Sequence, residues 1–241
     1  MAEPLLKLEG VHTHVGHYHI LHGVDLSVPA GELTMLLGRN GAGKTTTLRT
    51  VMNLWKASEG RITFDGRDIT NMATPQLARM GIAYVPEDMG IFRLLTVREN
   101  MMLAARNGPL DSGRLDWIFD LFPALKKFWN AEAGNLSGGQ KQMLSIARAL
   151  IEPRKLLLVD EPTKGLAPAI INELIGAFNQ LKEAETTVLL VEQNFNFARS
   201  LGDGVAVMDD GVTVHSGAMA DLAADEALQT RLLGLSLDSH Q

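Results

Sequence analysis

The chain has 241 residues, of which 46% are hydrophobic, so it can bury a large core as one domain or as a core with an inserted subdomain. Its formal net charge of −6 argues against a surface that coats nucleic acid, because such a surface would be basic. There is no cysteine for a disulfide framework, nothing resembles a signal peptide at residues 1–4, and no apolar run approaches the ~20 residues of a membrane span. We therefore expect an intracellular protein that contacts a membrane only through partners.

The first segment with recognisable chemistry is a strand followed by a glycine-rich loop. Strands are expected at 5–8 and 23–28, and the apolar run at 33–37 is typical of a buried strand. The residues that follow are Gly38, Arg39, Asn40, Gly41, Ala42, Gly43, Lys44 and Thr45. They match the P-loop (Walker A) pattern G-x-x-x-x-G-K-[ST], in which backbone N–H groups close around phosphate oxygens where a helix begins. We place that helix at 45–53, so that Thr46 also belongs to the nucleotide-binding segment.

Lys44 and Thr45 have separate expected roles within this loop. Lys44 would reach the β- and γ-phosphates of ATP. The Thr45 hydroxyl would bind Mg²⁺, because a hard cation takes oxygen ligands and an ATP-bound ion needs only one or two from the protein. The alternative is a glycine-rich turn in some other α/β protein, which the flanking strand and helix disfavour. The sequence therefore predicts ATP and Mg²⁺ as cofactors.

Between this loop and residue 150 the pattern changes from strands to helices. A strand at 60–66 runs into an Asp-Gly turn, and residues 82–85 form a short buried strand. Between these strands, Thr74 is expected to cap a helix that has Pro75 at its first position. From about residue 88 to residue 150 the pattern is helical and irregular.

Within the helical stretch, residues 136–140 read Leu136, Ser137, Gly138, Gly139 and Gln140, and a helix is expected to follow. Ser137 is a good N-cap residue, and the two glycines leave backbone N–H groups bare. The positive end of the helix dipole lies at the same place. This helix start is therefore a second candidate site for an anion.

The run at 156–159 has no polar alternation, as expected for a strand buried on both faces of a parallel sheet. It ends in Asp160 and Glu161, at the carboxyl edge where such sheets place ligands. Asp160 would hold Mg²⁺ through water, while Glu161 would polarise the water that attacks the γ-phosphate. The alternative is that both acids only cap the next segment. A helix at 169–182 and a strand at 188–191 complete the expected core.

As a set, these motifs resemble those of ATP-binding cassette (ABC) proteins over essentially the whole chain. Residues 136–140 look like the ABC signature motif, which implies that they act in trans on the γ-phosphate held by a second cassette of a head-to-tail dimer. The resemblance implies an α/β fold: a P-loop NTPase (RecA-like) core, an antiparallel β subdomain and an inserted α-helical subdomain. We expect the single domain 1–241 to divide into a core at approximately 1–87 and 151–241 and a helical subdomain at approximately 88–150.

Three shorter phrases resemble the ATPase subunits of branched-chain (hydrophobic) amino acid importers, in particular the shorter of their two usual cassettes. They are Val85-Pro86-Glu87, Leu166-Ala167-Pro168 and Val191-Glu192-Gln193-Asn194, and the tail at 228–234 is also similar. Importers of urea and short-chain amides have similar cassettes, so the cargo stays open.

The resemblance implies an ATP-hydrolysing subunit that powers an importer from the cytoplasmic face of the inner membrane. Its implied partners are a second cassette, transmembrane permease subunits and a separate substrate-binding protein, with no nucleic acid. Two alternatives remain. The chain could be a binding-only cassette that completes a partner's active site, or a soluble ABC ATPase outside transport.

Two residues depart from the general ABC pattern near the expected active site. Glu87 stands where most cassettes have a glutamine that links the Mg²⁺ site to the membrane partner. Its carboxylate could bind Mg²⁺ but adds negative charge, and the alternative is an ordinary solvated acid. Gln193 stands where most cassettes have a switch histidine, so it can donate a hydrogen bond to the γ-phosphate but cannot become cationic. We expect hydrolysis to survive with Glu161 as the essential residue and Glu87 and Gln193 assisting. Lys164, unusual for the subgroup, is expected either to be solvated or to have a role that the sequence does not specify.

The adenine contact is the least defined part of the expected site. Cassettes stack adenine on an aromatic residue before the first glycine-rich turn, and spacing from Gly16 puts Val15 there. Tyr18 or a nearby histidine are the alternatives.

A histidine cluster surrounds this turn, formed by His12, His14, His17, His19 and His22. A metal site is one interpretation, but we favour exposed turn and strand residues because the spacing crosses the turn. Residues 92–102 are expected to receive the membrane subunit's coupling helix, with packing inside the helical subdomain as the alternative.

Overall fold

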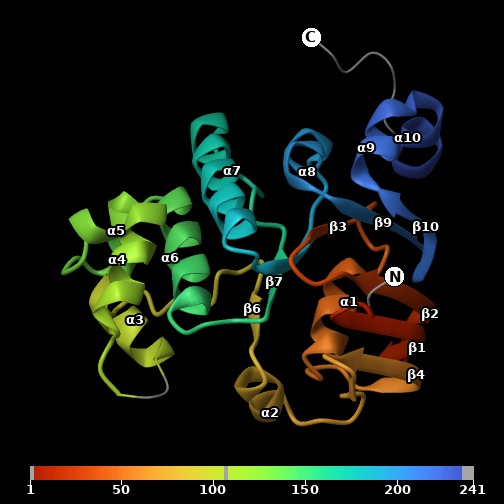
Figure 1. The fold of residues 1–241 in the computed structure, drawn as a ribbon, viewed down its shortest axis with the longest axis horizontal. Coiled ribbons are helices and arrows are strands. Elements are labelled where there is room, and N and C mark those ends of the chain that lie inside the picture. Colours follow the sequence, from red (N-terminus) through yellow and green to blue (C-terminus); the bar gives the residue numbers. More distant parts are fainter. Residues whose placement is uncertain (1–2, 106–107, 235–241) are drawn as a thin grey trace.

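A computed structural model describes residues 3–105 and 108–234. Residues 1–2 and 235–241 of the expected core, and 106–107 of the expected helical subdomain, lie outside the described residues. Two β-sheets lie at one side of the molecule and a group of helices at the other, with further helices above the larger sheet (Figure 1). The chain is therefore an α/β protein, as the sequence predicts.

The larger sheet contains the strands that carry the expected motifs. It has six strands in the order β10-β9-β3-β8-β7-β6, and all neighbouring pairs are parallel except β9 with β10. The strands are β3 (Leu33–Gly38), β6 (Ile82–Val85), β7 (Leu156–Asp160), β8 (Thr187–Val191), β9 (Gly204–Asp209) and β10 (Val212–Ala218). Because β3, β8 and β7 are adjacent and parallel, their carboxyl ends meet at one edge of the sheet.

Both faces of this sheet are covered, which explains the unbroken apolar runs. Alternate residues of β3, β7 and β8 belong to two separate hydrophobic clusters. One cluster packs on α6 (Gly138–Leu150), α7 (Pro168–Glu183) and α8 (Phe195–Leu201). The other packs on α1 (Lys44–Val51) and on the smaller sheet. A strand buried on both faces has no exposed side to carry polar residues.

The smaller sheet is antiparallel and covers α1. Its order is β2-β1-β4-β5. The strands are β1 (Leu6–Val15), β2 (Tyr18–Val28), β4 (Ala57–Phe64) and β5 (Arg67–Asp68). The first two extend well beyond the expected strands at 5–8 and 23–28, because their pairing continues through the histidine-rich segment to the pair Val15 and Tyr18.

The remaining helices form the periphery. Four of the helices between residues 97 and 150 gather at the side remote from β10 (Figure 1). In this group α6 is joined by α3 (Val97–Ala104), α4 (Ser112–Leu121) and α5 (Pro123–Lys127). The 3-10 turn η1 (Ala133–Asn135) precedes α6 and is hydrogen-bonded to the segment before α3. The other helices are α2 (Thr74–Arg79), α9 (Met219–Ala224) and α10 (Glu226–Leu233). Within the described part of the chain, no helix is both long and apolar enough to cross a membrane.

Two helix starts were predicted from capping residues, with different outcomes. Ser137 caps α6 as expected, since its Oγ accepts from the Gln140 N–H at 3.3 Å while the Ser137 N–H donates to Gln140 Oε1 at 3.0 Å. The prediction for Thr74 was wrong, because the N-cap of α2 is Ala73 and Thr74 is already helical. The Thr74 hydroxyl instead donates to the Met52 carbonyl oxygen at 2.9 Å, so a tertiary contact takes the place of the cap.

Candidate functional site

The loop between β3 and α1 has a backbone shape that requires glycine. Gly41 and Gly43 have φ values of 85° and 100°, in the left-handed region. A Cβ atom on Gly43 would lie 2.8 Å from Leu21 Cδ2, and one on Gly38 would clash with the Met208 carbonyl oxygen. The loop therefore forms a bare backbone cradle at the start of α1, which suits an anion such as a phosphate.

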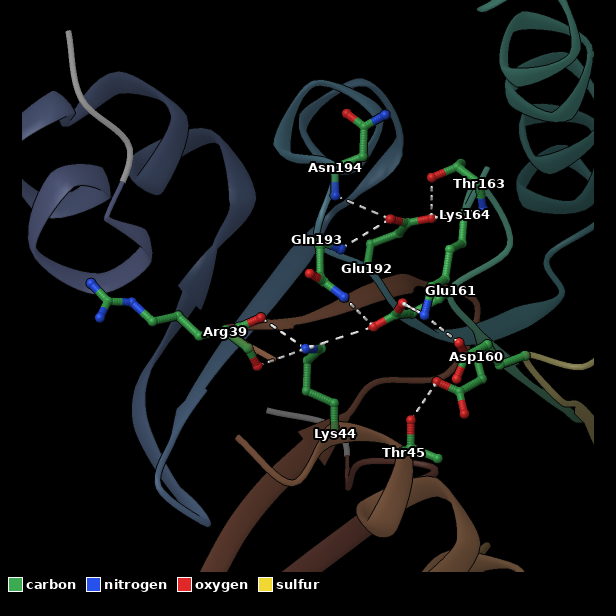
Figure 2. A network of polar contacts seen from close by, with 12 residues as sticks. Arg39, Lys44, Thr45, Asp160, Glu161, Thr163, Lys164, Glu192, Gln193 and Asn194 are labelled. Carbon is green, nitrogen blue, oxygen red and sulfur yellow. Dashed lines mark hydrogen bonds and ion pairs between the residues drawn. The ribbon is translucent and has the colours of Figure 1, made fainter. Parts of the chain in front are cut away.

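Lys44 is the first residue of α1 and turns back over this loop. Its Nζ donates to the carbonyl oxygens of Gly38 at 2.8 Å and Arg39 at 3.0 Å (Figure 2). It lies 3.9 Å from Glu161 Oε1, with only 5% of its side chain exposed. Burial lowers the pKa of Lys44, and Glu161 and Asp160 oppose that shift. The cation is thus held at the loop, beside the acids at the end of β7.

Asp160 accepts hydrogen bonds from hydroxyl groups of two elements, α1 and β6. Thr45 Oγ1 donates to its Oδ1 at 3.0 Å, and the Tyr84 hydroxyl of β6 donates to its Oδ2 at 3.1 Å. Asp160 is fully buried, and burial raises its pKa. The hydroxyl of Thr45 beside a carboxylate is a donor set that suits a hard cation such as Mg²⁺. The sequence predicted that Thr45 and Asp160 both hold Mg²⁺, but it assigned no role to Tyr84. Burial raises the pKa of Tyr84.

Glu161 occupies an unusual backbone position at the end of β7. Its φ is 45°, which is uncommon outside glycine, and its N–H donates to the Val191 carbonyl oxygen at 3.0 Å. Its carboxylate Oε1 accepts from Gln193 Nε2 at 2.6 Å (Figure 2). From the sequence, Glu161 and Gln193 were each expected to take part in hydrolysis, but no contact between them was predicted. The structure shows that their side chains are in direct contact.

Glu192 is a buried residue that sequence reasoning gave no role. Its Oε1 accepts from the N–H and hydroxyl of Thr163 at 3.0 and 2.7 Å. Its Oε2 accepts from the N–H groups of Gln193 and Asn194 at 3.0 and 3.1 Å. Burial raises the pKa of Glu192, and these four bonds oppose that shift. Glu192 thereby ties the loop after β7 to the loop after β8. A charged residue directly after an all-apolar buried strand was the signal available in the sequence.

Glu87, two residues beyond β6, forms an ion pair with Lys164. Lys164 Nζ donates to Glu87 Oε1 at 2.5 Å and lies 3.7 Å from Glu161 Oε2. The hydrogen bond to Glu87 is the main cause that raises the pKa of Lys164, and Glu161 adds to it. Both side chains are exposed to solvent, as the alternative expectation for each has it, and in addition they form an ion pair at the edge of the site.

A cavity of about 210 Å³ lies between the P-loop and the end of β8. Its lining includes Gly38, Arg39 and Asn40 from β3 and the loop, and Glu192 and Gln193 from the segment that follows β8. A larger cavity of about 880 Å³ is lined by residues at the opposite ends of β3 and β9, away from the expected motifs. The smaller cavity is therefore the one associated with the residues that sequence reasoning selected.

The signature residues lie at a separate place from the P-loop. Ser137 and Gly138 are exposed at the start of α6, and Leu136 is buried. Gly139 packs closely, since a Cβ there would lie 2.5 Å from Ile170 Cγ2 of α7. Among the described residues, no hydrogen bond or ion pair joins 136–140 to the P-loop.

The expected adenine position lies at the tip of the β1–β2 hairpin. Val15 is half-buried there, opposite Tyr18, which is 76% exposed. On the same hairpin, His19 stacks on His14 with ring centroids 4.1 Å apart, and its Nε2 lies 3.1 Å from His12 Nδ1. Over residues 3–105 and 108–234, no group of three or more His, Cys, Asp or Glu side chains could hold a metal ion.

Comparisons with known proteins agree with the fold. A family model for ABC transporters matches residues 21–164. The chain is 38% identical over 232 residues to the high-affinity branched-chain amino acid transport ATP-binding protein BraG of Pseudomonas aeruginosa, covering 95% of this chain and 100% of BraG. A solved nucleotide-free ATP-binding cassette from an ABC transporter has a TM-score of 0.82 at 26% identity, covering 96% of this chain and 99% of that chain. A dimeric cassette in a post-hydrolysis state, bound to ADP and phosphate, has a TM-score of 0.78 at 26% identity. The match covers 89% of this chain and 98% of that chain.

The resemblance drawn from the motifs is confirmed, because both the family model and the alignment with BraG include the P-loop, the signature phrase and the acids at the end of β7. The fold is that of an ABC cassette, with a P-loop core, an antiparallel β subdomain and a helical subdomain. The chain therefore belongs to the ABC transporter family, as a nucleotide-binding ATPase cassette.

Proposed function

We propose that this cassette supplies the energy for an importer of branched-chain or other amino acids. The observation that carries the proposal is the 38% identity to BraG, which extends over the full length of that branched-chain amino acid transport protein. Cargo is chosen by other subunits, so urea and short-chain amides are the competing cargo classes for the test. ATP binding would close two cassettes and hydrolysis would reopen them, which drives alternating access in the membrane partners.

Nucleotide binding is assigned to the P-loop and the start of α1. In this proposal the residues that hold ATP are Gly38, Arg39, Asn40, Gly41, Ala42, Gly43, Lys44, Thr45 and Thr46, with Val15 beside the adenine. Lys44, already held beside the loop carbonyls, would exchange those contacts for phosphate oxygens. Bound Mg²⁺ would supply charge neutralisation to the triphosphate. Thr45 and Asp160 would hold it, with Glu87 as a third oxygen ligand once it leaves Lys164.

Hydrolysis is assigned to Glu161, assisted by Gln193. A carboxylate at this edge can accept the proton of the attacking water, provided that it points at the γ-phosphate. The 2.6 Å hydrogen bond from Gln193 fixes Oε1 of Glu161, while Oε2, which lies 3.7 Å from Lys164 Nζ, is the oxygen proposed to accept from water. Gln193 is thus proposed to orient the base without adding charge.

The second half of each active site is proposed to come from another cassette. The bare start of α6, formed by residues 136–140, would face the γ-phosphate of the partner cassette. A structurally similar cassette is dimeric when bound to ADP and phosphate, which supports this arrangement. We further propose the division into a core at approximately 1–87 and 151–241 and a helical subdomain at approximately 88–150, because the helices α3 to α6 lie together.

The membrane partners are proposed to dock beside α3. Exposed apolar side chains gather in this segment, namely Phe92, Leu94, Met102 and Leu103. Apolar side chains exposed in one segment are typical of a protein interface. The chain would therefore lie at the cytoplasmic face of the membrane through permease subunits, which would also receive a separate substrate-binding protein.

The test is reconstitution of the chain with the permease and binding proteins encoded beside it, in proteoliposomes. We expect ATP hydrolysis that rises when the binding protein carries leucine, isoleucine or valine, and that is lost in Lys44→Ala and Glu161→Gln. Stimulation by urea or short-chain amides instead would change the cargo class. ATP binding without turnover in the complete assembly would favour a binding-only cassette.

A further inference from the structure

The register between β6 and β7 places two like charges side by side. The strands are parallel, with Val85 opposite Val159. Glu87 and Glu161 each follow these residues by two positions, so the two carboxylates leave the sheet at the same level. Neighbouring carboxylates repel one another unless a cation lies between them. The sheet register therefore creates a need for a positive charge at this edge.

Lys164 supplies that charge. Its Nζ donates to Glu87 Oε1 at 2.5 Å and lies 3.7 Å from Glu161 Oε2 (Figure 2). The exposed fraction of the side chain is 61% for Lys164 and 39% for Glu87, but only 10% for Glu161. The ammonium group thus bridges two carboxylates at the boundary between the buried site and solvent.

The backbone of Lys164 is held in place for this contact. Its N–H donates to the Glu161 carbonyl oxygen at 3.3 Å, closing a turn over residues 161–164. Thr163, just before it, is fixed through its N–H and hydroxyl to the buried Glu192. The side chain of Lys164 therefore starts from a rigid turn directly above the acids.

The charge balance of the site explains what this cation can do. The acids Asp160, Glu161, Glu87 and Glu192 outnumber the lysines Lys44 and Lys164, so the site carries an excess of negative charge before any nucleotide arrives. A triphosphate adds several more negative charges. Without Lys164, a metal-free triphosphate would meet Glu87 without its cation and Glu161 with only Lys44 beside it, at short range where Coulomb repulsion is strongest.

We propose that Lys164 is a positioning residue that neutralises Glu87 and Glu161, and that it thereby lets ATP bind before Mg²⁺ compensates the charge. The proposal rests on the proposed function, in which residues 38–46 hold ATP. Lys164 acts through the two carboxylates and does not touch the reacting atoms. If Glu87 were to hold Mg²⁺, Lys164 would still have Glu161 as its partner.

The experiment measures the affinity of the purified chain for a fluorescent ATP analogue, once in EDTA and once in excess Mg²⁺. In EDTA, Lys164→Gln is expected to weaken binding by about threefold to tenfold. In Mg²⁺ the loss is expected to stay within about twofold, because the divalent ion replaces the missing charge. Lys164→Arg should keep the wild-type affinity in both buffers. Lys56→Gln, which removes an exposed lysine outside this site, is the matched control for net charge.

A double mutant tests whether Lys164 affects ATP binding through the Glu87 carboxylate. Glu87→Gln removes one of the two acids, so Lys164→Gln should cost less in that background than in wild type. An equal loss in EDTA and in Mg²⁺, or additive effects of the two substitutions, would overturn the proposal, because a merely structural lysine behaves in that way. If the wild-type chain binds no ATP in either buffer, the nucleotide site itself fails. If wild type binds and Lys164→Gln matches it in EDTA, only the role of Lys164 fails.

Discussion

Gln193 and Glu161 are 32 residues apart in the chain, yet the side-chain amide of Gln193 donates to the Glu161 carboxylate at 2.6 Å. The contact joins the loop after β8 to the loop after β7. Glu192 reinforces it, because its buried carboxylate binds backbone N–H groups of both loops. The orientation of the proposed catalytic carboxylate therefore depends on a residue from a different strand.

Replacing Gln193 should lower the rate of ATP hydrolysis without weakening ATP binding. In Gln193→Ala we expect kcat to fall by about tenfold to a hundredfold, because a misplaced carboxylate loses alignment with water. The affinity for ATP should change little, since Lys44 and the loop are untouched. Steady-state ATPase kinetics together with nucleotide titration measure the two effects, and Gln180→Ala on α7 is the control. Unchanged kcat would show that the hydrogen bond does not orient Glu161.

Glu161→Gln should abolish ATP hydrolysis but leave ATP binding intact. The amide cannot accept the proton of water, and loss of a general base costs about a hundredfold or more in rate. Binding should persist, in contrast to Lys44→Ala, which removes the cation beside the P-loop. Hydrolysis and ATP binding are measured in the assembled complex with only this subunit's site competent. Wild-type turnover there by Glu161→Gln would contradict the assignment.

Glu192 should matter for stability. Its side chain is 2% exposed and accepts four hydrogen bonds. Glu192→Ala leaves those donors buried without a partner, so we expect a loss of about 1–3 kcal/mol in the free energy of unfolding. Urea titration measures it, with the exposed Glu173→Gln as the control. Equal midpoints for the two variants would mean that water replaces the carboxylate without cost.

The paired glycines at the start of α6 should differ in their response to alanine. A Cβ on Gly139 would lie 2.5 Å from Ile170 Cγ2, whereas one on Gly138 would lie 3.8 Å from Leu166 Cδ2, an ordinary contact. Gly139→Ala should therefore destabilise the chain by about 1–3 kcal/mol through overpacking between α6 and α7. Gly138→Ala should leave the unfolding midpoint nearly unchanged but impair ATPase activity in the dimer. If Gly139→Ala were as stable as the wild type, the Ile170 side chain would be able to move aside at little cost in free energy.

The histidine cluster should make stability fall at mildly acidic pH. Partial burial, together with His14, His22 and His12, lowers the pKa of His19 from 6.5. A group with a lowered folded pKa stabilises fully above its unfolded pKa, and this contribution is lost as pH falls through the folded pKa. Urea midpoints should therefore drop as the pH falls below the unfolded pKa of about 6.5, and less so in His19→Gln. His17→Gln is the control, and equal slopes for both variants would exclude His19 as the cause.

Much of the core could be predicted from the sequence because its signals are local. The strand at 82–85 is confirmed as β6, and the run at 156–159 is confirmed within β7. A strand buried on both faces is apolar throughout, so composition alone reveals it. The P-loop is also visible in the sequence, because the positive φ values of Gly38, Gly41 and Gly43 demand glycine at fixed spacing in one segment. The close approaches of Gly38 to Met208 and of Gly43 to Leu21, in contrast, are tertiary contacts. The prediction for Thr74 was wrong because a contact with Met52, far along the chain, outweighed the local capping preference.

The sequence by itself determined the family, the position of the P-loop and the acids after β7, since these depend on spacing and residue type along one segment. Only the tertiary structure decided that Gln193 binds Glu161, that Glu192 is buried between two loops, and that Lys164 bridges Glu87 and Glu161. These contacts join residues from different strands. Their existence depends on sheet order and register, which arise from packing of the whole core and have no signature in any single segment.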